Sequence, residues 1–377
     1  MCSSKDFNPE ITIASPGRIN FIGEHTDYNM GFVLPTAIDR KIIFKLRKNN
    51  SINNCYVYSA NYDTSFSFDL SNISISEKEW ENYILGVIHE IRQLTDKLRG
   101  FDCILSSDIP IGSGISSSAA LECGFAFGLN ELFTLNFSKR DIVDLSQRAE
   151  HNYVGTKCGI MDQYASVMSK KDHVILLDCK FVKHEYIPLK IKPYKVLLLN
   201  TNVSHSLASS EYNNRREECE KGVRIIQQEY HQVKSLRDVD EKMLAEFRET
   251  LGETIYRRCN YIVEEKLRVL RAVEALKENR LKDFGSLMYA THLGLSKKYE
   301  VSCPELDFLV EFAKKYKTII GSRMMGGGFG GCTINLIHES AVEQFIKIVS
   351  TAYFKEFNIK LDAFDANPNG GTSILND

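Results

Sequence analysis

Apolar and polar residues alternate in the first third of the chain and follow helical spacing in much of the remainder. Phe66, Phe68 and Leu70 are separated by polar residues, which is the period of a half-buried strand. Predicted strands in this part are Lys41–Arg47, Asn54–Tyr62, Thr64–Leu70 and Phe101–Leu105. Helical spacing begins with Glu77–Leu98, whose apolar positions share one side: Trp80, Ile84, Val87, Ile88, Ile91 and Leu94.

Similar patterns predict a helix-rich second half and the order of the remaining elements. Ser138 and Asp141 have the spacing of a capping box, so a helix begins there. The other predicted helices are Ser116–Phe133, Ser138–His151, Asp162–Lys170, Ser209–Tyr230, Leu251–Glu278, Leu281–Tyr289, Glu305–Tyr316 and Ser340–Phe357. The other predicted strands are His173–Cys179, Lys195–Asn200, Cys332–Ile337 and Leu361–Phe364. The polar, Pro-containing sequence at Ile187–Pro193 predicts a domain boundary, with one domain at residues 1–190 and a second at 191–377.

The amino-acid composition and charge argue against several classes of protein. The 377 residues carry 47 Lys and Arg against 49 Asp and Glu, a net charge of −2, which argues against a nucleic-acid binder. The start lacks the apolar core of a signal peptide, and no run approaches the ~20 apolar residues of a membrane span. The 10 Cys are scattered without a CxxC pair, as is typical of reduced thiols. We therefore expect a cytoplasmic protein with no membrane association and no obligate protein partner.

Several short motifs in the chain do not support the functions they are associated with. Gly326, Gly328 and Gly331 match the dinucleotide pattern GxGxxG, but a strand-like run follows where that pattern needs a helix. Asp283-Phe-Gly spells the DFG of protein kinases, yet no HRD motif precedes it and the triplet has helical spacing. The chain contains neither GxxxxGK[ST] nor GxSxG, which excludes a P-loop and a nucleophile elbow.

Three segments carry candidate chemistry. The signature segment, Pro16–Asn29, gathers Arg18, Glu24, His25, Asp27 and Tyr28 around two glycines. Carboxylates and an imidazole suit a polyhydroxyl ligand, because they accept and donate hydrogen bonds together; a solvated turn is the alternative.

The second segment is the Gly/Ser loop, Gly112–Ser118, which runs into an apolar helix. Unpaired N–H groups at such a helix start suit a di- or triphosphate, although a flexible loop with a Ser cap is the simpler alternative. The third segment is the glycine run, Gly326–Gly331, which holds five glycines in six positions. It indicates either a backbone that passes very close to a ligand or an ordinary hairpin turn.

Together these segments resemble the GHMP small-molecule kinases. The signature segment resembles that of the galactokinases within this family almost letter for letter, and the resemblance extends from Ser15 to about Ile337. It includes Arg148–His151, Cys158–Gln163 and His205–Tyr212. It implies an α+β fold of two domains, an N-terminal domain like ribosomal protein S5 domain 2 and a C-terminal ferredoxin-like domain, with the active site in the cleft between them.

The resemblance also implies a reaction and its residues. The reaction is ATP-dependent phosphorylation of the anomeric hydroxyl of α-D-galactose, with Mg²⁺ as cofactor. Asp162 is the implied catalytic carboxylate, and Arg18 lies beside it to balance charge. Ser118 and Glu150 are the implied Mg²⁺ ligands. The implied ATP contacts are Ser59, Gly112, Ser113, Gly114, Ile115, Ser116, Ser117 and Ser118, with Ile115 standing where Leu is usual.

The implied galactose contacts are Glu24, His25, Thr26, Asp27, Gly159, Asp162 and Tyr212. Two alternatives stay open at this point. One is a kinase for a related sugar such as N-acetylgalactosamine, although Thr26, Tyr28 and Asn29 have the galactose form. The other is a non-catalytic sensor that binds galactose and ATP, although Ser116–Ala120 of the Gly/Ser loop is complete.

Overall fold

The computed structural model describes residues 7–110, 112–204 and 208–375. The described strands are β1 (Ile11–Asn20), β2 (Phe32–Val33), β3 (Pro35–Lys48), β4 (Asn54–Ser59), β5 (Thr64–Asp69), β6 (Phe101–Ser107), β7 (His173–Asp178), β8 (Lys183–Pro188), β9 (Tyr194–Ser204), β10 (Ile319–Met324), β11 (Gly330–His338), β12 (Asp362–Asp365) and β13 (Ser373–Ile374). The described α-helices are α1 (Glu79–Leu94), α2 (Ser117–Phe133), α3 (Lys139–Ala149), α4 (Met161–Met168), α5 (Ala208–Ile226), α6 (Glu241–Glu246), α7 (Arg248–Lys277), α8 (Leu281–Gly294), α9 (Pro304–Ala313) and α10 (Val342–Phe357).

Most elements expected from the pattern form, with ends shifted by a few residues. The capping box at Ser138 and Asp141 is confirmed on both sides, and Asp283 lies within helix α8 as its spacing indicates. The start of the segment His205–Tyr212 lies outside the described residues. Strand β1 was not expected, because it is buried almost throughout, lacks alternation and contains Pro16 at an irregularity in its pairing. Strands β2, β8, β10 and β13 and helix α6 also had no clear periodic signal.

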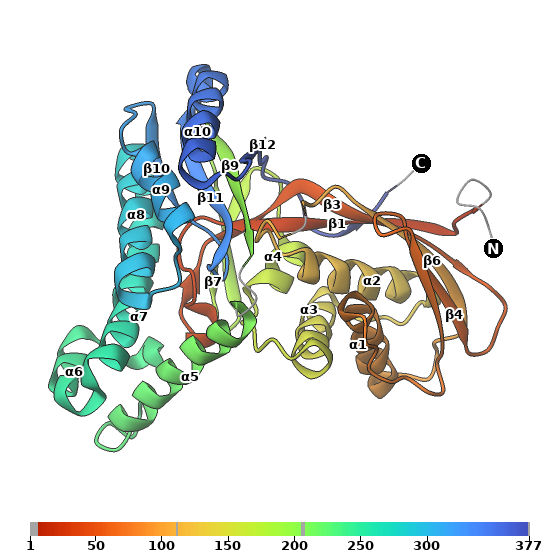
Figure 1. The fold of residues 1–377 in the computed structure, drawn as a ribbon. Helices are drawn as coiled ribbons and strands as arrows, with labels where there is room; N and C mark the ends of the chain where they lie inside the picture. The colour runs from red at the N-terminus through yellow and green to blue at the C-terminus, as the bar shows by residue number, and fades with distance from the viewer. Residues whose placement is uncertain (1–6, 111, 205–207, 376–377) are drawn as a thin grey trace.

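The first sheet has the strand order β13-β1-β3-β6-β4-β5, and only β4 and β6 pair in parallel. Helices α1 to α4 gather against one face of this sheet (Figure 1). Helix α2 lies close to strands β1 and β3, where Gly124 faces Phe44 and Ser15 at distances that leave no room for a Cβ. This close approach sets the start of α2, and with it the Gly/Ser loop, against the end of β1.

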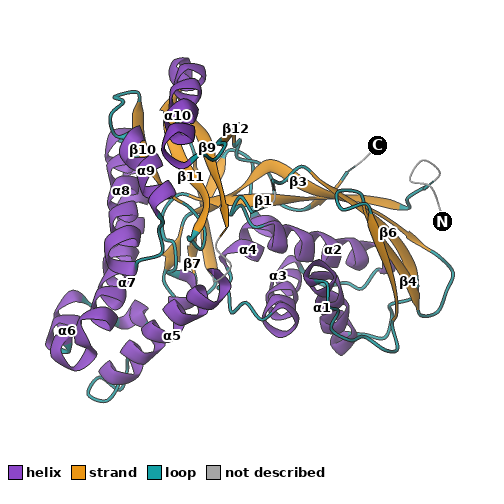
Figure 2. Ribbon diagram, viewed as in Figure 1, coloured by secondary structure: helices purple, strands orange, loops and turns teal. Residues whose placement is uncertain are grey.

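A second sheet, β10-β11-β9-β12, is antiparallel and carries helices α8, α9 and α10 (Figure 2). Leu197 and Leu199 of β9 pack with Phe345, Val349 and Tyr353 of α10 in one apolar cluster. Gly285 of α8 approaches β10 so closely that a Cβ would lie 2.0 Å from the Ile320 carbonyl oxygen. A third, three-stranded sheet has the order β2-β7-β8.

The glycine run forms the turn between β10 and β11, which confirms the hairpin expectation. Gly326, Gly328 and Gly331 all have positive φ, between +79° and +87°, where a side chain would be strained. This turn lies against the Gly/Ser loop, since a Cβ on Gly326 would be 3.0 Å from the Gly114 carbonyl oxygen. Two loops about two hundred residues apart in sequence therefore meet at one place.

Candidate active site

A cavity of about 110 Å³ lies where these loops meet the signature segment. Its lining comes from both halves of the chain: Arg18, Glu24, His25, Asp27, Glu150, Thr156, Cys158, Gly159, Met161, Asp162, Tyr212, Gly326 and Gly327. The space suffices for a small polar ligand, since one water needs only ~10–15 Å³ on this measure. Most side chains that the sequence proposed for the sugar are thus brought together here.

The Arg18 guanidinium and the Asp162 carboxylate form a bidentate pair at the edge of this cavity. Nε donates to Oδ1 at 2.7 Å and Nη2 donates to Oδ2 at 2.7 Å. Ser116 also donates a hydrogen bond to Asp162 Oδ2, and Arg18 Nη1 donates to the Gly114 carbonyl at 2.7 Å. Burial alone would lower the pKa of Arg18, but the neighbouring carboxylates outweigh it and raise that pKa. The guanidinium is therefore a fixed positive charge between Asp162 and the Gly/Ser loop.

Glu24 is held in place by groups from opposite ends of the chain. Its Oε1 forms an ion pair with Arg323 of β10 and accepts from the Gly326 N–H at 2.7 Å. Its Oε2 accepts from Asn20 Nδ2 at 2.8 Å. Burial by itself raises the pKa of Glu24, but Arg323, Arg18 and these donors outweigh it and lower that pKa. Glu24 therefore stays ionised in the cavity wall.

Asp27 differs from Glu24 because its pKa is raised instead of lowered. Burial, followed by the charge of Asp162, raises its pKa to about 6. Its carboxylate lies directly against Gly159, where a Cβ would be 1.9 Å from Oδ2. The prediction that Gly159 belongs to the site therefore has a steric basis, because any larger residue would occupy the position of the Asp27 carboxylate.

His25 forms part of the cavity wall beneath Tyr212. It is a non-glycine residue with φ of 64°, and its ring centroid is 5.2 Å from that of Tyr212. Burial lowers the pKa of His25 to about 4, so the imidazole is neutral near neutral pH. Its Nε2 is buried and has no hydrogen-bond partner among the residues that the structure describes. A ligand hydroxyl can supply the missing partner.

Thr26 does not line the cavity. Its hydroxyl is buried and lies 2.8 Å from the Gly23 carbonyl oxygen and 2.6 Å from that of Phe32. Those contacts close the turn that carries His25 and Asp27. Thr26 therefore stabilises the conformation of the signature segment without contacting the cavity.

A second pocket, of about 140 Å³, begins at the first turn of helix α2. Ser117, Ser118 and Ser59 contribute to its lining, and the buried Ser59 Oγ has no hydrogen-bond partner in the described part of the chain. The rest of the lining is largely aromatic and apolar: Ile42, Tyr62, Trp80, Tyr83, Leu105, Ile109 and Leu121. Sequence reasoning did not identify Trp80 or Tyr83 as site residues, because the spacing of Trp80 is equally that of a core helix.

The Gly/Ser loop lines the second pocket with its last two serines and is hydrogen-bonded to Arg18 and Asp162 of the first cavity. Gly112 and Gly114 have φ of +72°, and Ser116 precedes α2 with φ of 58° and no side-chain cap. Ser113 is turned inward, donating to the Pro110 carbonyl at 2.6 Å. The Ile115 carbonyl accepts from the Arg18 backbone N–H at 2.9 Å. The uncapped helix start leaves N–H groups for an anion.

Glu150 lies behind Asp162, at the end of helix α3. Burial, followed by the charge of Asp162, raises its pKa to about 7, and a hydrogen bond with Ser118 acts in the other direction. Gln163 Nε2 donates to Glu150 Oε2 at 2.7 Å. In the part of the chain that the structure describes, no three His, Cys, Asp or Glu residues are arranged to hold a metal ion by themselves.

The sequence and the fold match one family of kinases. Residues 82–170 match the GHMP kinases N-terminal domain, and residues 272–356 match the GHMP kinases C-terminal model. The mevalonate kinase of Methanococcus jannaschii, at 19% identity, shares the fold with a TM-score of 0.63 over 95% of this chain and 98% of that one. The chain is a GHMP kinase, and the α+β fold expected for that family is confirmed.

Closer relatives identify the branch of the family. Residues 4–48 match the galactokinase galactose-binding signature. The galactokinase of Thermosipho africanus is 43% identical over 363 residues, which cover 96% of this chain and 99% of that protein. The structure of Lactococcus lactis galactokinase complexed with galactose has a TM-score of 0.93 at 34% identity, covering 97% of this chain and 95% of that one. The chain belongs to the galactokinases.

None of the helices described is long and apolar enough to cross a lipid bilayer.

Proposed function

We propose that the first cavity binds galactose and that the chain transfers the γ-phosphoryl group of ATP to its anomeric hydroxyl. The products are α-D-galactose 1-phosphate and ADP. The observation that carries this proposal is the Arg18–Asp162 pair, which lies between the cavity and the Gly/Ser loop. A carboxylate and a guanidinium at the junction of two binding sites suit phosphoryl transfer, which depends on positioning and charge neutralisation.

In this mechanism Asp162 accepts a hydrogen bond from the anomeric hydroxyl and takes its proton. The hydroxyl oxygen forms a bond to the γ-phosphorus, while the bond from that phosphorus to the β-phosphate oxygen breaks. Arg18 keeps Asp162 oriented through two hydrogen bonds of 2.7 Å each. Its positive charge also stabilises the negative charge spread over the transferring phosphoryl oxygens. Ser116, which donates to Asp162, couples the loop to this carboxylate.

Glu24, His25, Asp27, Gly159 and Tyr212 form the sugar-binding set of this proposal. Three of these side chains present a fixed acceptor or an unpaired polar atom to the cavity. Gly159 provides room for Asp27, and Tyr212 covers His25. A sugar epimer would leave one of these buried groups unpaired, which costs roughly 1–3 kcal/mol per group. That penalty is the basis for preferring galactose over glucose.

The second pocket takes the nucleotide in this proposal. Trp80 and Tyr83 provide flat apolar surfaces for the adenine ring, and the unpartnered Ser59 hydroxyl is available for a hydrogen bond. Ser117 and Ser118 stand where the triphosphate would leave the pocket and enter the loop. Gly112 and Gly114 allow the backbone to approach the phosphates, since both have positive φ.

Ser118 and Glu150 fit a Mg²⁺ ion that travels with ATP. A hydroxyl and a carboxylate are hard oxygen donors, and Mg²⁺ in kinase sites usually takes one or two protein carboxylates besides phosphate oxygens and water. The buried Glu150 carboxylate has no cationic partner among its described contacts, so a cation there would stabilise its ionised form. When bound, the ion would neutralise charge on the β- and γ-phosphates.

We also propose that the division at residue 190 separates the two domains and that the chain acts in the cytoplasm. The nine cysteines among the described residues form no disulfide, which suits a reducing compartment.

The test is ADP release over a panel of sugars: galactose, glucose, N-acetylgalactosamine, 2-deoxygalactose, galacturonate and arabinose. The proposal requires galactose to have the highest kcat/KM. A higher kcat/KM with N-acetylgalactosamine would instead identify a kinase for that sugar. Galactose binding without ADP release would identify a sensor.

A further inference from the structure

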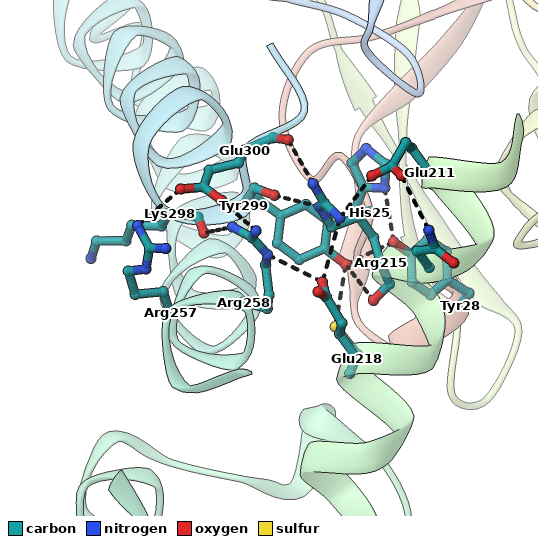
Figure 3. Close-up of polar contacts among 12 residues, drawn as sticks. His25, Tyr28, Glu211, Arg215, Glu218, Arg257, Arg258, Lys298, Tyr299 and Glu300 are labelled. Atoms are coloured by element: carbon teal, nitrogen blue, oxygen red, sulfur yellow. Dashed lines mark hydrogen bonds and ion pairs between the residues drawn. The ribbon is translucent and has the colours of Figure 1, made fainter. Parts of the chain in front are cut away.

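Behind His25 lies a chain of hydrogen-bonding groups that the reaction itself does not use. His25 Nδ1 is 2.8 Å from the Tyr28 hydroxyl, which is 2.8 Å from the Tyr299 hydroxyl. The Tyr299 hydroxyl is in turn 3.2 Å from the Cys219 sulfur. Figure 3 shows His25, Tyr28 and Tyr299 joined in this order. We call Tyr28, Tyr299 and Cys219 the support chain.

The support chain is anchored by two buried arginines. Arg215 Nε donates to the Tyr299 carbonyl at 2.8 Å, and Nη2 donates to the Glu300 carbonyl at 3.0 Å. Arg258 Nη1 donates to the Lys298 carbonyl at 2.5 Å. The dashed lines in Figure 3 converge on this short segment. Three consecutive carbonyls are thereby fixed, so the Tyr299 ring has little freedom to move.

All three groups of the support chain carry a hydrogen atom near neutral pH. Burial raises the pKa of Cys219 to about 12, and burial likewise holds the pKa values of Tyr28 and Tyr299 well above their usual range. Each group can therefore donate one hydrogen bond. The direction in which they donate decides which nitrogen of the neutral His25 ring bears its proton.

A phenol is a stronger acid than a neutral imidazole, and an imidazole nitrogen is a stronger base than a phenol oxygen. The better pairing therefore has Tyr28 donating to His25 Nδ1. Tyr299 then donates to Tyr28 at 2.8 Å, which is closer than the Arg215 carbonyl at 3.5 Å, and the Cys219 thiol donates to Tyr299. Each hydrogen is then used once. This order puts the imidazole proton on Nε2, the nitrogen that is buried without a partner.

We propose that Tyr28 and Tyr299 are positioning residues that fix His25 with its Nε2–H directed at the bound sugar. His25 then donates a hydrogen bond to a hydroxyl oxygen of the ligand, whereas the ionised Glu24 can only accept one. His25 is thus a donor in a fixed place among the carboxylate acceptors of the cavity wall, and residues outside the cavity set the direction in which it donates. This inference rests on the proposed galactose site.

The kinetic test is a double-mutant cycle with Tyr28→Phe, His25→Ala and the double variant. The phenylalanine keeps the ring that packs near His25 and Tyr212 and removes only the hydroxyl. We expect the galactose KM of Tyr28→Phe to rise roughly three- to tenfold, while its kcat and its KM for ATP stay unchanged. In the His25→Ala background the same substitution should add nothing. Independent, additive effects of the two substitutions would overturn the proposal.

Tyr353→Phe is the matched control. Tyr353 is fully buried, as Tyr299 is, and its hydroxyl donates to the Thr201 carbonyl at 2.9 Å, outside the support chain. It should leave the galactose KM at the wild-type value. A rise equal to that of Tyr28→Phe would show that loss of any buried tyrosine hydroxyl has this effect, and would overturn the assignment.

Nitrogen NMR of labelled histidine gives a direct reading of the His25 tautomer in the sugar-free protein. We expect the Nε2–H form in the wild type and a mixture of tautomers in Tyr28→Phe and Tyr299→Phe. An Nδ1–H form in the wild type would overturn the proposal. Failure of the wild type to phosphorylate galactose would refute the proposed function separately, because the tautomer is measured without sugar or ATP.

Discussion

Gly159→Ala tests whether the position of the Asp27 carboxylate controls catalysis. A Cβ at residue 159 would lie 1.9 Å from Asp27 Oδ2 and 2.0 Å from Cγ. The backbone of Gly159 does not have the positive φ that would strain alanine. The nearest atoms that the new Cβ meets all belong to Asp27, which must retreat by at least about 1.1 Å to restore the 3.0 Å below which Cβ contacts essentially never occur.

A displacement of that size has a predictable cost. A misplacement of about 1 Å in a positioning group can reduce the rate about 10²-fold. We therefore expect kcat/KM for galactose to fall about 100-fold, which corresponds to about 2.7 kcal/mol of transition-state stabilisation. Overpacking a buried site costs typically about 1–3 kcal/mol, so the protein should remain folded. ADP release measures the first quantity and thermal unfolding measures the second.

Gly370→Ala is the control, because a Cβ at that position meets no atom within 4 Å and its φ is not positive. Its kinetics should equal those of the wild type. If Gly159→Ala retained galactose kcat/KM within a few-fold of wild type while folded, the placement of Asp27 would not matter to the reaction, and the steric argument for Gly159 would be wrong.

Four further substitutions separate the roles proposed for the site. Asp162→Asn should retain galactose binding, measured by calorimetry, and lose about 10²–10⁴-fold in kcat, since an amide cannot take the proton. Trp80→Ala should raise the KM for ATP and leave that for galactose unchanged. Glu150→Ala should raise the Mg²⁺ concentration needed for half-maximal rate more than it changes the galactose KM. Asp27→Asn should abolish galactose turnover and raise the melting temperature near neutral pH. Burial raises the pKa of Asp27 from 3.8 to about 6, so ionising this carboxyl lowers the free energy of unfolding. The protonated carboxyl stabilises the fold fully below pH 3.8, and that stabilisation is lost as the pH rises through 6. The amide of Asn does not ionise and keeps it. The stabilising effect of Asp27→Asn should accordingly vanish at low pH, and a pH-independent change in melting temperature would contradict this reasoning.

Local features of the sequence were sufficient to predict several elements in and around the site. The capping box at Ser138, the helix that begins near Ser116 and the turn at Gly326, one of two alternatives for the glycine run, each depend on residues a few positions apart. Such features follow from backbone conformation and nearby hydrogen bonds, so they can be read without the fold. The family was identified differently, from a resemblance to the galactokinases that runs from Ser15 to about Ile337.

Other parts were decided only by tertiary structure. Glu24 owes its lowered pKa chiefly to Arg323, which is 299 positions away in the chain. Trp80 has the spacing of a core residue. It lines the second pocket because residues of strand β6 and helix α2 pack beside it and form the rest of the pocket wall. Tyr299 reaches Tyr28 through a segment that Arg215 and Arg258 hold in place. These contacts depend on how distant elements pack, and no local pattern encodes the direction in which a buried side chain meets a partner hundreds of residues away.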